Sequence, residues 1–424
     1  MRVLLSAFAC DPVSGSDEEV GWQWAKELAV RGVDVTVITR KSHQLDIEHH
    51  VAATGQCKNA KFVYVDIDWL HALLHRVNPR NHIYYYFWQW VAYRAAARLH
   101  AITPFDLIHH VTWVSFRQPS FMGLLGSPML FGPVAGGDEI PQGYARAFSL
   151  NQRLIEILRG TANFLTRYDP FMRMTFNSAT RIYFTSDSHL QYVSRFVREK
   201  AAIELAIGCN INEINLIDNE TKYARQGNRL LFVGRCIGWK GMDIGLLILA
   251  RIRQARPDVT LTIIGDGVDR ARWMKKAKEL GLEQVIDWCG WLPKPTVLDM
   301  YAKFDVLFYP SLRDSGGFVV LEALQCGLPA VVFKLGGPGV VVDETCGARV
   351  EASANREETI HNYATAVLTT LQRVRNDPAL PSACCARAAN FTWDALIDRI
   401  YGTVFETKKR DEQTFVVSDC GLKA

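Results

Sequence analysis

The chain opens with two short apolar runs that flank one amphipathic stretch, and this order restricts the possible folds more than any other feature. Residues 2–9 (RVLLSAFA) and 33–39 (VDVTVIT) are the apolar runs, and a helical pattern with an acidic first turn lies between them and ends at Gly32. Strands that are buried on both faces of a parallel sheet have such near-continuous apolar sequences. The strand, helix, strand order therefore predicts an α/β fold with helices on both faces of a parallel sheet.

The same alternation begins a second time near residue 230. After the polar residues 186–228, where we place the crossing between domains, the run Leu230–Gly234 starts a new series. The 424 residues suit two to three domains at roughly 150 residues each. Further strands are expected at 62–67, 106–111, 128–131, 181–185, 260–264, 285–287, 306–309, 330–333 and 348–350. We predict two doubly wound sheets with a cleft between them, and ligands in such sheets bind at the carboxyl ends of strands.

Charge, cysteines and hydropathy exclude several classes of protein. The formal net charge of +4 is too small to indicate a nucleic-acid partner. The ten cysteines form no C-x-x-C pair, so we expect buried, reduced thiols in a cytoplasmic protein. No window of 18 apolar residues is present, and the first apolar run is expected to be a strand rather than part of a signal peptide.

Two cations follow the first strand of the second half. The strand ends at Gly234-Arg235, and Lys240-Gly241 stands at the start of the next helix. Backbone N–H groups and the positive end of a helix dipole, together with two cations, suit a diphosphate. Arg and Lys are also common at a solvated helix start, so these residues alone leave both interpretations open.

Two acidic residues flank a double glycine after the strand expected at 306–309. They are Asp314 and Glu322, with Gly316-Gly317 between them. Glu322 falls on an apolar helical stretch, so it is expected to be partly buried and to need hydrogen-bond partners, which ribose hydroxyl groups would supply. The alternative is an Asp that caps the helix and a Glu on its surface.

The acid-x7-acid pattern at a loop-to-helix junction, preceded by Gly-Arg and Lys-Gly, resembles the donor site of glycosyltransferase family 4. Further matches extend the resemblance over most of the chain: 261–267 (LTIIGDG), 288–291 (WCGW), 327–329 (GLP) and 391–393 (FTW). The family has the GT-B fold, with two Rossmann-like domains, and retains the anomeric configuration. The resemblance implies an N-terminal acceptor domain at 1–205, a nucleotide-sugar donor domain at 206–393, and a segment 394–424 that packs back on the first domain.

The resemblance also assigns roles to the motif residues. Glu322 would hold the donor ribose, and Asp314, where the family usually has Glu, would contact the transferred sugar. Arg235 and Lys240 would neutralise the leaving diphosphate, so no metal and no cofactor is expected. Donor contacts through the backbone would come from Gly316, Gly317 and Phe318, and from the first-domain loop with Gly15 and Ser16, which has one glycine where the family usually has two.

The family has a histidine near the end of a first-domain strand, and two candidates are present here. They are His109 and His110, which are expected to point to opposite faces because strand side chains alternate. One of them would contact the transferred sugar, with His110 favoured because it lies nearer the strand end; the alternative is that neither is functional. The glycine-rich segment 131–138 is expected to be either a contact in the cleft or a plain loop.

Aromatic residues are concentrated in one segment of the first half. Seven of the ten residues 84–93 (YYYFWQWVAY) are aromatic, and arginines and further apolar residues surround them over 69–98. Tyr and Trp favour the depth of lipid headgroups, so this stretch suits peripheral contact with a membrane. The alternative is a helix packed on the first sheet.

The predicted function is retaining transfer of a sugar, of the hexosyltransferase type, from a nucleotide-sugar donor to a glycan or lipid-linked acceptor in cell-surface polysaccharide biosynthesis. The expected location is the cytoplasm, with peripheral contact at the inner face of the cytoplasmic membrane. The alternatives are a non-catalytic sugar-nucleotide-binding or scaffold relative of the same fold, and, among enzymes, a phosphorylase or a sugar-nucleotide epimerase.

Overall fold

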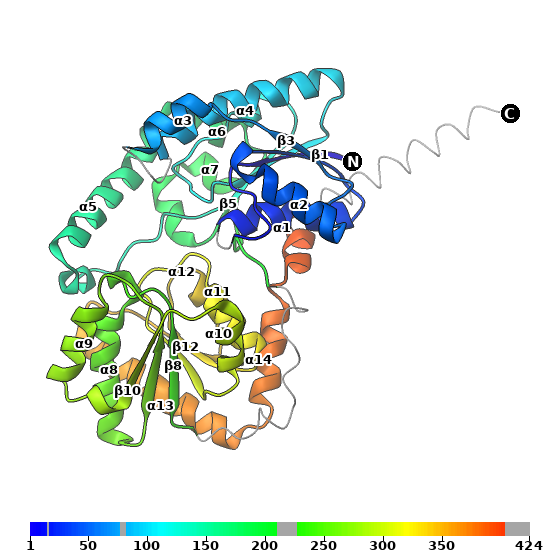
Figure 1. Ribbon diagram of the computed structural model, residues 1–424. Coiled ribbons are helices and arrows are strands. Elements are labelled where there is room, and N and C mark those ends of the chain that lie inside the picture. Colours follow the sequence, from blue (N-terminus) through cyan, green and yellow to red (C-terminus); the bar gives the residue numbers. More distant parts are fainter. Residues whose placement is uncertain (15–16, 77–81, 210–226, 403–424) are drawn as a thin grey trace.

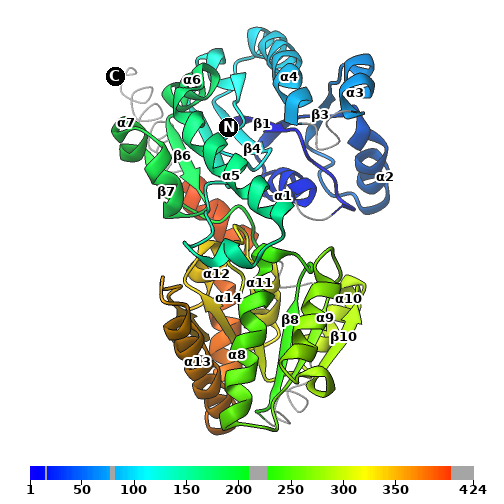
Figure 2. The same ribbon diagram turned by 90° about the vertical axis from the view of Figure 1, so that its left-hand side faces the viewer.

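The chain folds into two α/β domains that lie one above the other, each a parallel sheet between helices (Figure 1). The computed structural model describes residues 1–14, 17–76, 82–209 and 227–402. Figure 2 shows the same two domains from the side, with α5 at the front of the first domain and α8 at the front of the second. The prediction of two domains, each with a parallel sheet, is confirmed.

The first domain is built on seven parallel strands in the order β3-β2-β1-β4-β5-β6-β7, so the winding direction reverses between β1 and β4. The strands are β1 (Arg2–Ala7), β2 (Asp34–Thr39), β3 (Lys61–Tyr64), β4 (Leu107–Thr112), β5 (Met129–Val134), β6 (Arg181–Phe184) and β7 (Ala201–Ile203). The α-helices are α1 (Asp17–Val30), α2 (Gln44–Thr54), α3 (Asp68–His75), α4 (His82–Ile102), α5 (Leu150–Leu165), α6 (Pro170–Ser178) and α7 (Arg195–Glu199).

The second domain repeats this plan with six parallel strands in the order β10-β9-β8-β11-β12-β13, and its winding reverses between β8 and β11. The strands are β8 (Arg229–Val233), β9 (Thr260–Ile264), β10 (Ile286–Gly290), β11 (Val306–Tyr309), β12 (Ala330–Phe333) and β13 (Gly347–Val350). The α-helices are α8 (Met242–Ala255), α9 (Arg270–Glu279), α10 (Lys294–Tyr301), α11 (Phe318–Gln325), α12 (Gly336–Val341), α13 (Arg356–Asn376) and α14 (Leu380–Ala389).

Apolar packing on both faces of the first sheet explains why its strands have nearly continuous apolar sequences. One face carries α4 and α6, with Trp88 and Phe131 fully buried in that layer. The other face carries α1 and the last described helix, with Trp24 and Tyr401 fully buried there. Both layers exclude water, so the sheet is a rigid platform for the residues at its strand ends.

The last described helix, residues 393–402, leaves the second domain and packs on the first (orange to red in Figure 1). Arg399 lies 3.0 Å from Glu204, and Asp394 is paired with Arg31. The described part of the segment 394–424 therefore lies on the first domain. The predicted boundary at 205/206 falls in the connection between β7 and β8.

The predicted crossing at 186–228 begins too early and is wrong in its first part. Residues 187–203 contain the 3-10 helix η5 (Asp187–Tyr192), α7 and the edge strand β7, which pairs with β6. A three-residue edge strand with one exposed residue leaves too short an apolar run to be recognised in a sequence.

The aromatic segment 84–93 lies on α4 and has two different faces. Tyr85 and Trp88 are fully buried against the sheet, and the Trp88 indole N–H donates to a backbone carbonyl at 2.8 Å. Phe87 and Trp90 are 48% and 52% exposed on the outer face. The core interpretation holds for one face of the helix, and the other face presents apolar surface to solvent.

The cysteines are mostly buried, as expected. Among the residues that the structure describes, seven of the nine cysteines are buried. The helices of this described part include none that is both long enough and apolar enough to cross a membrane.

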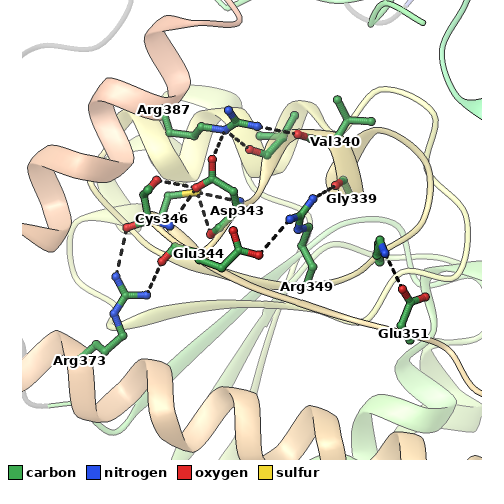
Figure 3. A network of polar contacts seen from close by, with 12 residues as sticks. Gly339, Val340, Asp343, Glu344, Cys346, Arg349, Glu351, Arg373 and Arg387 are labelled. Atoms are coloured by element: carbon green, nitrogen blue, oxygen red, sulfur yellow. Dashed lines mark hydrogen bonds and ion pairs between the residues drawn. The ribbon is translucent and has the colours of Figure 1, made fainter.

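A polar network fixes the loop between α12 and β13 to α13 and α14 (Figure 3). Asp343 lies 3.1 Å from Arg387 of α14, which also donates to two carbonyls of α12. Burial raises the pKa of Asp343, but hydrogen bonds from Thr345 and the charge of Arg387 lower it by more, so the pKa lies below its ordinary value. The network bears on the donor motif because α12 contacts it: the Gly337 N–H donates to the Asp314 carbonyl at 2.9 Å.

Replacing Asp343 with Asn is expected to lower the free energy of unfolding by about 1–3 kcal/mol at neutral pH, because Arg387 loses its charged partner. The folded-state pKa is lowered, so the carboxylate stabilises the fold above its ordinary pKa of 3.8, and this contribution is lost as the pH falls below that value. Urea unfolding of the wild type and of Asp343→Asn should therefore show a difference in the free energy of unfolding that becomes smaller at acid pH. Glu351→Gln breaks only the exposed pair with Lys334 and is the control, with a loss of under about 0.5 kcal/mol; equal losses in the two variants would contradict the prediction.

Candidate functional site: a donor-type site at the end of the second sheet

The motif residues of the second half lie at the carboxyl ends of two neighbouring strands, β8 and β11. These strands meet where the strand order reverses, which is where open α/β sheets bind ligands. Gly234 and Arg235 follow β8, and residues 310–317 lead from β11 into α11. The topology thus brings both motifs to one edge of the sheet.

Lys240 and Asp314 form an ion pair at the centre of this site. The Lys240 Nζ lies 2.8 Å from the Asp314 carboxylate, and the Tyr309 hydroxyl donates to the same carboxylate at 2.6 Å. Gly241, with φ 74°, follows the lysine, and a Cβ there would lie 1.8 Å from the Pro310 carbonyl oxygen. Only glycine allows this close approach between the start of α8 and the residue after β11. The sequence assigned Lys240 and Asp314 to different parts of a donor, whereas here they contact each other.

The backbone of the double-glycine turn also binds Asp314. The N–H groups of Gly316 and Gly317 both lie 3.2 Å from its carboxylate, and Gly317 has the left-handed φ of 76° that glycine tolerates best. Burial raises the pKa of Asp314, but Lys240, Tyr309 and the Gly317 N–H lower it by more, so the net shift is downward. Asp314 is therefore an anion at neutral pH, and two N–H groups expected to face a donor are bound to this carboxylate.

Glu322 lies on the second turn of α11 and is partly buried, as predicted, with 20% of its side chain exposed. The Tyr301 hydroxyl donates to its carboxylate at 3.0 Å, and the Lys294 Nζ lies 4.0 Å away. Both partners come from α10, so two helices fix the position of this carboxylate. Arg235 is exposed, and within the described ranges it has no carboxylate at ion-pair distance. Phe318 is the partly exposed first residue of α11.

Gly15 and Ser16 lie outside the described residues. The described part of the first domain approaches the donor loop through Asp138, whose carboxylate accepts hydrogen bonds from Ser315 and Ser186, both at 2.6 Å. Asp138 ends the glycine-rich segment 131–138, so this segment contacts the donor loop of the other domain. No group of three or more His, Cys, Asp or Glu side chains among the described residues is arranged to hold a metal ion.

Further polar contacts between the domains were not predicted from the sequence. Arg313, next to Asp314, pairs with Glu156 of α5 through the two terminal nitrogens of its guanidinium group. Gln152 donates to Asp269 at 2.7 Å from the first turn of the same helix. A charged residue on an amphipathic helix gives no sign of its partner in the sequence, whereas Asp138 could have been found from its place after two glycines.

His109 and His110 point to opposite faces of β4, as predicted, but both are fully buried. His109 lies 2.9 Å from the Tyr401 hydroxyl and 2.6 Å from the Gly132 carbonyl, and His110 stacks on Phe131 with 5.0 Å between ring centroids. Burial lowers the pKa of His109 to about 4 and that of His110 to about 3. Both imidazoles are therefore neutral core groups here, and neither is open to the sugar that sequence reasoning assigned to them.

Two solved structures with a similar architecture show which class of fold this is. Sucrose-phosphate synthase from Thermosynechococcus elongatus superimposes with a TM-score of 0.59 at 19% identity, over 96% of this chain and 99% of that one. Anabaena HepE in complex with UDP gives a TM-score of 0.58 at 17% identity, with the same coverage. At these identities the likeness shows the fold, which is that of the GT-B glycosyltransferases.

The sequence of the second domain narrows the class further. Residues 214–370 match the family described as Glycosyl transferases group 1. D-inositol 3-phosphate glycosyltransferase from Segniliparus rotundus is 32% identical over 172 residues, which are 39% of this chain and 37% of that protein. 2-Deoxystreptamine glucosyltransferase from Streptomyces kanamyceticus is 28% identical over 148 residues, 35% of this chain and 36% of that protein. The chain thus spans less than half the length of these relatives. The predicted relationship to GT-B glycosyltransferases is confirmed, and membership of family 4 is consistent with it.

Replacing His110 with Phe is expected to make the free energy of unfolding decrease less as the pH falls. The folded-state pKa of about 3 lies below the ordinary 6.5, so only the unfolded chain takes up this proton as the pH falls from 6.5 towards 3, and folding stability is lost over that window. His110→Phe removes one such group. The free energy of unfolding, measured with urea, should then fall less steeply in this window, by about 1.4 kcal/mol per pH unit. His49→Gln, which changes an exposed histidine, is the control for loss of an imidazole at the surface. Unchanged turnover is also expected; a large drop in turnover with stability intact would support the sugar contact instead.

Proposed function

We propose that the chain is a retaining glycosyltransferase of the hexosyltransferase type, which moves a sugar from a nucleotide-sugar donor to a glycan or lipid-linked acceptor in cell-surface polysaccharide biosynthesis. The observation that carries the proposal is the cluster of Lys240, Asp314 and Glu322 at the reversal point of a sheet whose sequence matches glycosyltransferases. The names of the relatives support sugar transfer, and the UDP complex of HepE supports a nucleoside diphosphate donor.

The proposed roles follow from the chemistry of each group. Glu322 accepts hydrogen bonds from the donor ribose, and its two partners on α10 keep it in place. Arg235 and Lys240 face the leaving diphosphate, and fixed positive charge at that point lowers the barrier to departure without a metal ion. Asp314 contacts the transferred sugar, and the acceptor attacks the face from which the diphosphate leaves.

We also propose peripheral contact with the inner face of the cytoplasmic membrane through α3 and the outer face of α4, with the chain located in the cytoplasm. Trp69 is 71% exposed, and Leu73, Phe87 and Trp90 are also exposed. Aromatic side chains of this kind favour the headgroup region of a bilayer. This placement would bring a lipid-linked acceptor to the first domain.

Glu322→Ala is expected to weaken binding of a nucleoside diphosphate by about tenfold or more, because ribose loses a charged hydrogen-bond acceptor. A thermal-shift panel of nucleotide sugars identifies the donor base, and calorimetry of wild type and variant with that nucleotide measures the loss. Glu279→Ala, at the end of α9, is the matched control and should bind normally. Equal affinities for wild type and Glu322→Ala would refute the ribose assignment.

Donor turnover separates the enzyme from its alternatives. A glycosyltransferase releases nucleoside diphosphate, slowly with water and faster with an acceptor. Binding of a nucleotide sugar without any release of nucleoside diphosphate or change of the sugar would favour the scaffold. Release of sugar phosphate that depends on added phosphate would favour a phosphorylase. Conversion of the donor sugar without release of nucleoside diphosphate would favour an epimerase.

Trp69→Ser combined with Trp90→Ser is expected to lower co-sedimentation with anionic liposomes several-fold while the fold is kept, because both indoles are exposed. Trp88 is unsuitable for this test because it is buried. Trp291→Ser, which changes a 72% exposed indole on the second domain, is the control and should not alter co-sedimentation. Equal co-sedimentation of all three proteins would show that the outer face of α4 does not bind membranes.

A further inference from the structure

A pocket of about 360 Å³ lies in the first domain between the segment after β5 and helix α5. One wall is apolar and includes Ile140 and Ile157, while the rest of the lining is charged or polar. In Figure 2, α5 lies at the front of the molecule, with no other helix in front of it. The residues that line the pocket are Asp138, Glu139, Ile140, Ala145, Arg146, Arg153, Glu156, Ile157, Arg159, Gly160 and Asn163.

Three arginines line this pocket, Arg146, Arg153 and Arg159. Arg117 does not line it, but it shares a carbonyl partner with Arg159. Arg117 and Arg159 both donate to the Gly136 carbonyl, at 2.9 and 2.8 Å, and Arg117 also donates to the buried side-chain amide of Asn163. Burial lowers the pKa of Arg159 to about 10, repulsion from Arg313 and Arg117 adds to that shift, and the charges of Glu156 and Asp138 oppose it. The same two causes, burial first and then Arg313, lower the pKa of Arg117. The arginines are thus close enough to repel one another.

Three carboxylates line the pocket beside the three arginines, and Arg117 and Arg313 add two further positive charges that act on Arg159, so positive charge is in excess. Glu156 is paired with Arg313, Asp138 accepts hydrogen bonds from two serine hydroxyls, and Glu139 accepts one from the Tyr192 hydroxyl. In the part of the chain that the structure describes, neither Arg117 nor Arg159 has a carboxylate at ion-pair distance, and the Arg159 Nε is buried without a hydrogen-bond partner. A buried N–H group without a partner is costly, so a bound anion that accepts a hydrogen bond from the Arg159 Nε would stabilise the pocket.

We propose that this pocket binds a phosphate group carried by the acceptor. Several guanidinium groups that converge from different elements suit a tetrahedral anion, because each of its oxygens accepts a charge-assisted hydrogen bond. The apolar wall at Ile140 and Ile157 would cover the part of the acceptor next to the phosphate. Asp138 joins this pocket to Ser315 of the donor loop, so the phosphate would lie beside the place of sugar transfer.

The acceptor role rests on the proposed glycosyltransferase function, whereas the pocket is tested by itself. The assay uses calorimetry to measure the binding of inorganic phosphate to the full chain. Arg159→Gln is expected to weaken binding by about tenfold or more, since a charge-assisted hydrogen bond to a buried anion is lost. Arg167→Gln removes the same charge from an exposed position outside the pocket and should leave the affinity unchanged.

A second variant covers the case in which Arg159→Gln does not fold. Arg153 is exposed and lines the pocket, so Arg153→Gln should fold and weaken phosphate binding by about threefold or more. Absence of phosphate binding by the wild type would overturn the proposal. So would equal affinities for the wild type and these pocket variants.

The phosphate could come from a soluble sugar phosphate or from a lipid headgroup, and two further arms distinguish these sources. Competition with a hexose phosphate tests the soluble source. Vesicles of phosphatidylcholine with and without phosphatidic acid test the lipid source, for which the exposed Leu154 and Leu158 of α5 would supply apolar contact. If the wild type binds phosphate but none of the nucleotide sugars in the panel, the proposed function is removed and the pocket remains. If it binds a nucleotide sugar but no phosphate, only the pocket proposal is removed.

Discussion

The donor-type site depends on one carboxylate, that of Asp314. It binds Lys240 from the connection between β8 and α8, Tyr309 from the end of β11 and two N–H groups of the turn before α11. Three chain segments thus share one anion, and removing that anion would leave a largely buried ammonium group without its charged partner, at a cost of several kcal/mol. The shape of the loop therefore follows from charge pairing as much as from the two glycines.

Much of the fold was predictable because the strands of a parallel sheet are apolar on both faces, and a nearly continuous apolar run is easily recognised. Strand β7 was missed because three residues at a sheet edge carry no such run. The site was predictable as a set of residues but not as a set of contacts. Glu322 was placed correctly as partly buried, while its partner Tyr301 gave no signal, because the sequence does not show which group a buried tyrosine hydroxyl will bind. Alternation placed His109 and His110 on opposite faces, but it contains no information about the helix 393–402 that covers one of them.

The donor loop is also held from outside its own domain. Ser315 contacts Asp138 and Arg313 contacts Glu156, so the residues on both sides of Asp314 are bound to the first domain. Any rigid-body separation of the two domains has to break these contacts before the loop is released. The state of the loop is therefore coupled to the distance between the domains, which is a physical basis for gating by domain closure.

The bond between His109 and Tyr401 has a consequence for the synthesis of the protein. Trp24, His109 and Tyr401 pack together in the core of the first domain, although nearly 300 residues separate the last two in the chain. A ribosome that adds about 5–20 residues per second has released all six strands of the second sheet before it supplies the residue that completes this layer. The first domain to emerge is thus the last to be finished, and until then it lacks the helix 393–402 that covers one face of its sheet. The order of the sequence therefore leaves apolar surface of the first domain uncovered during translation.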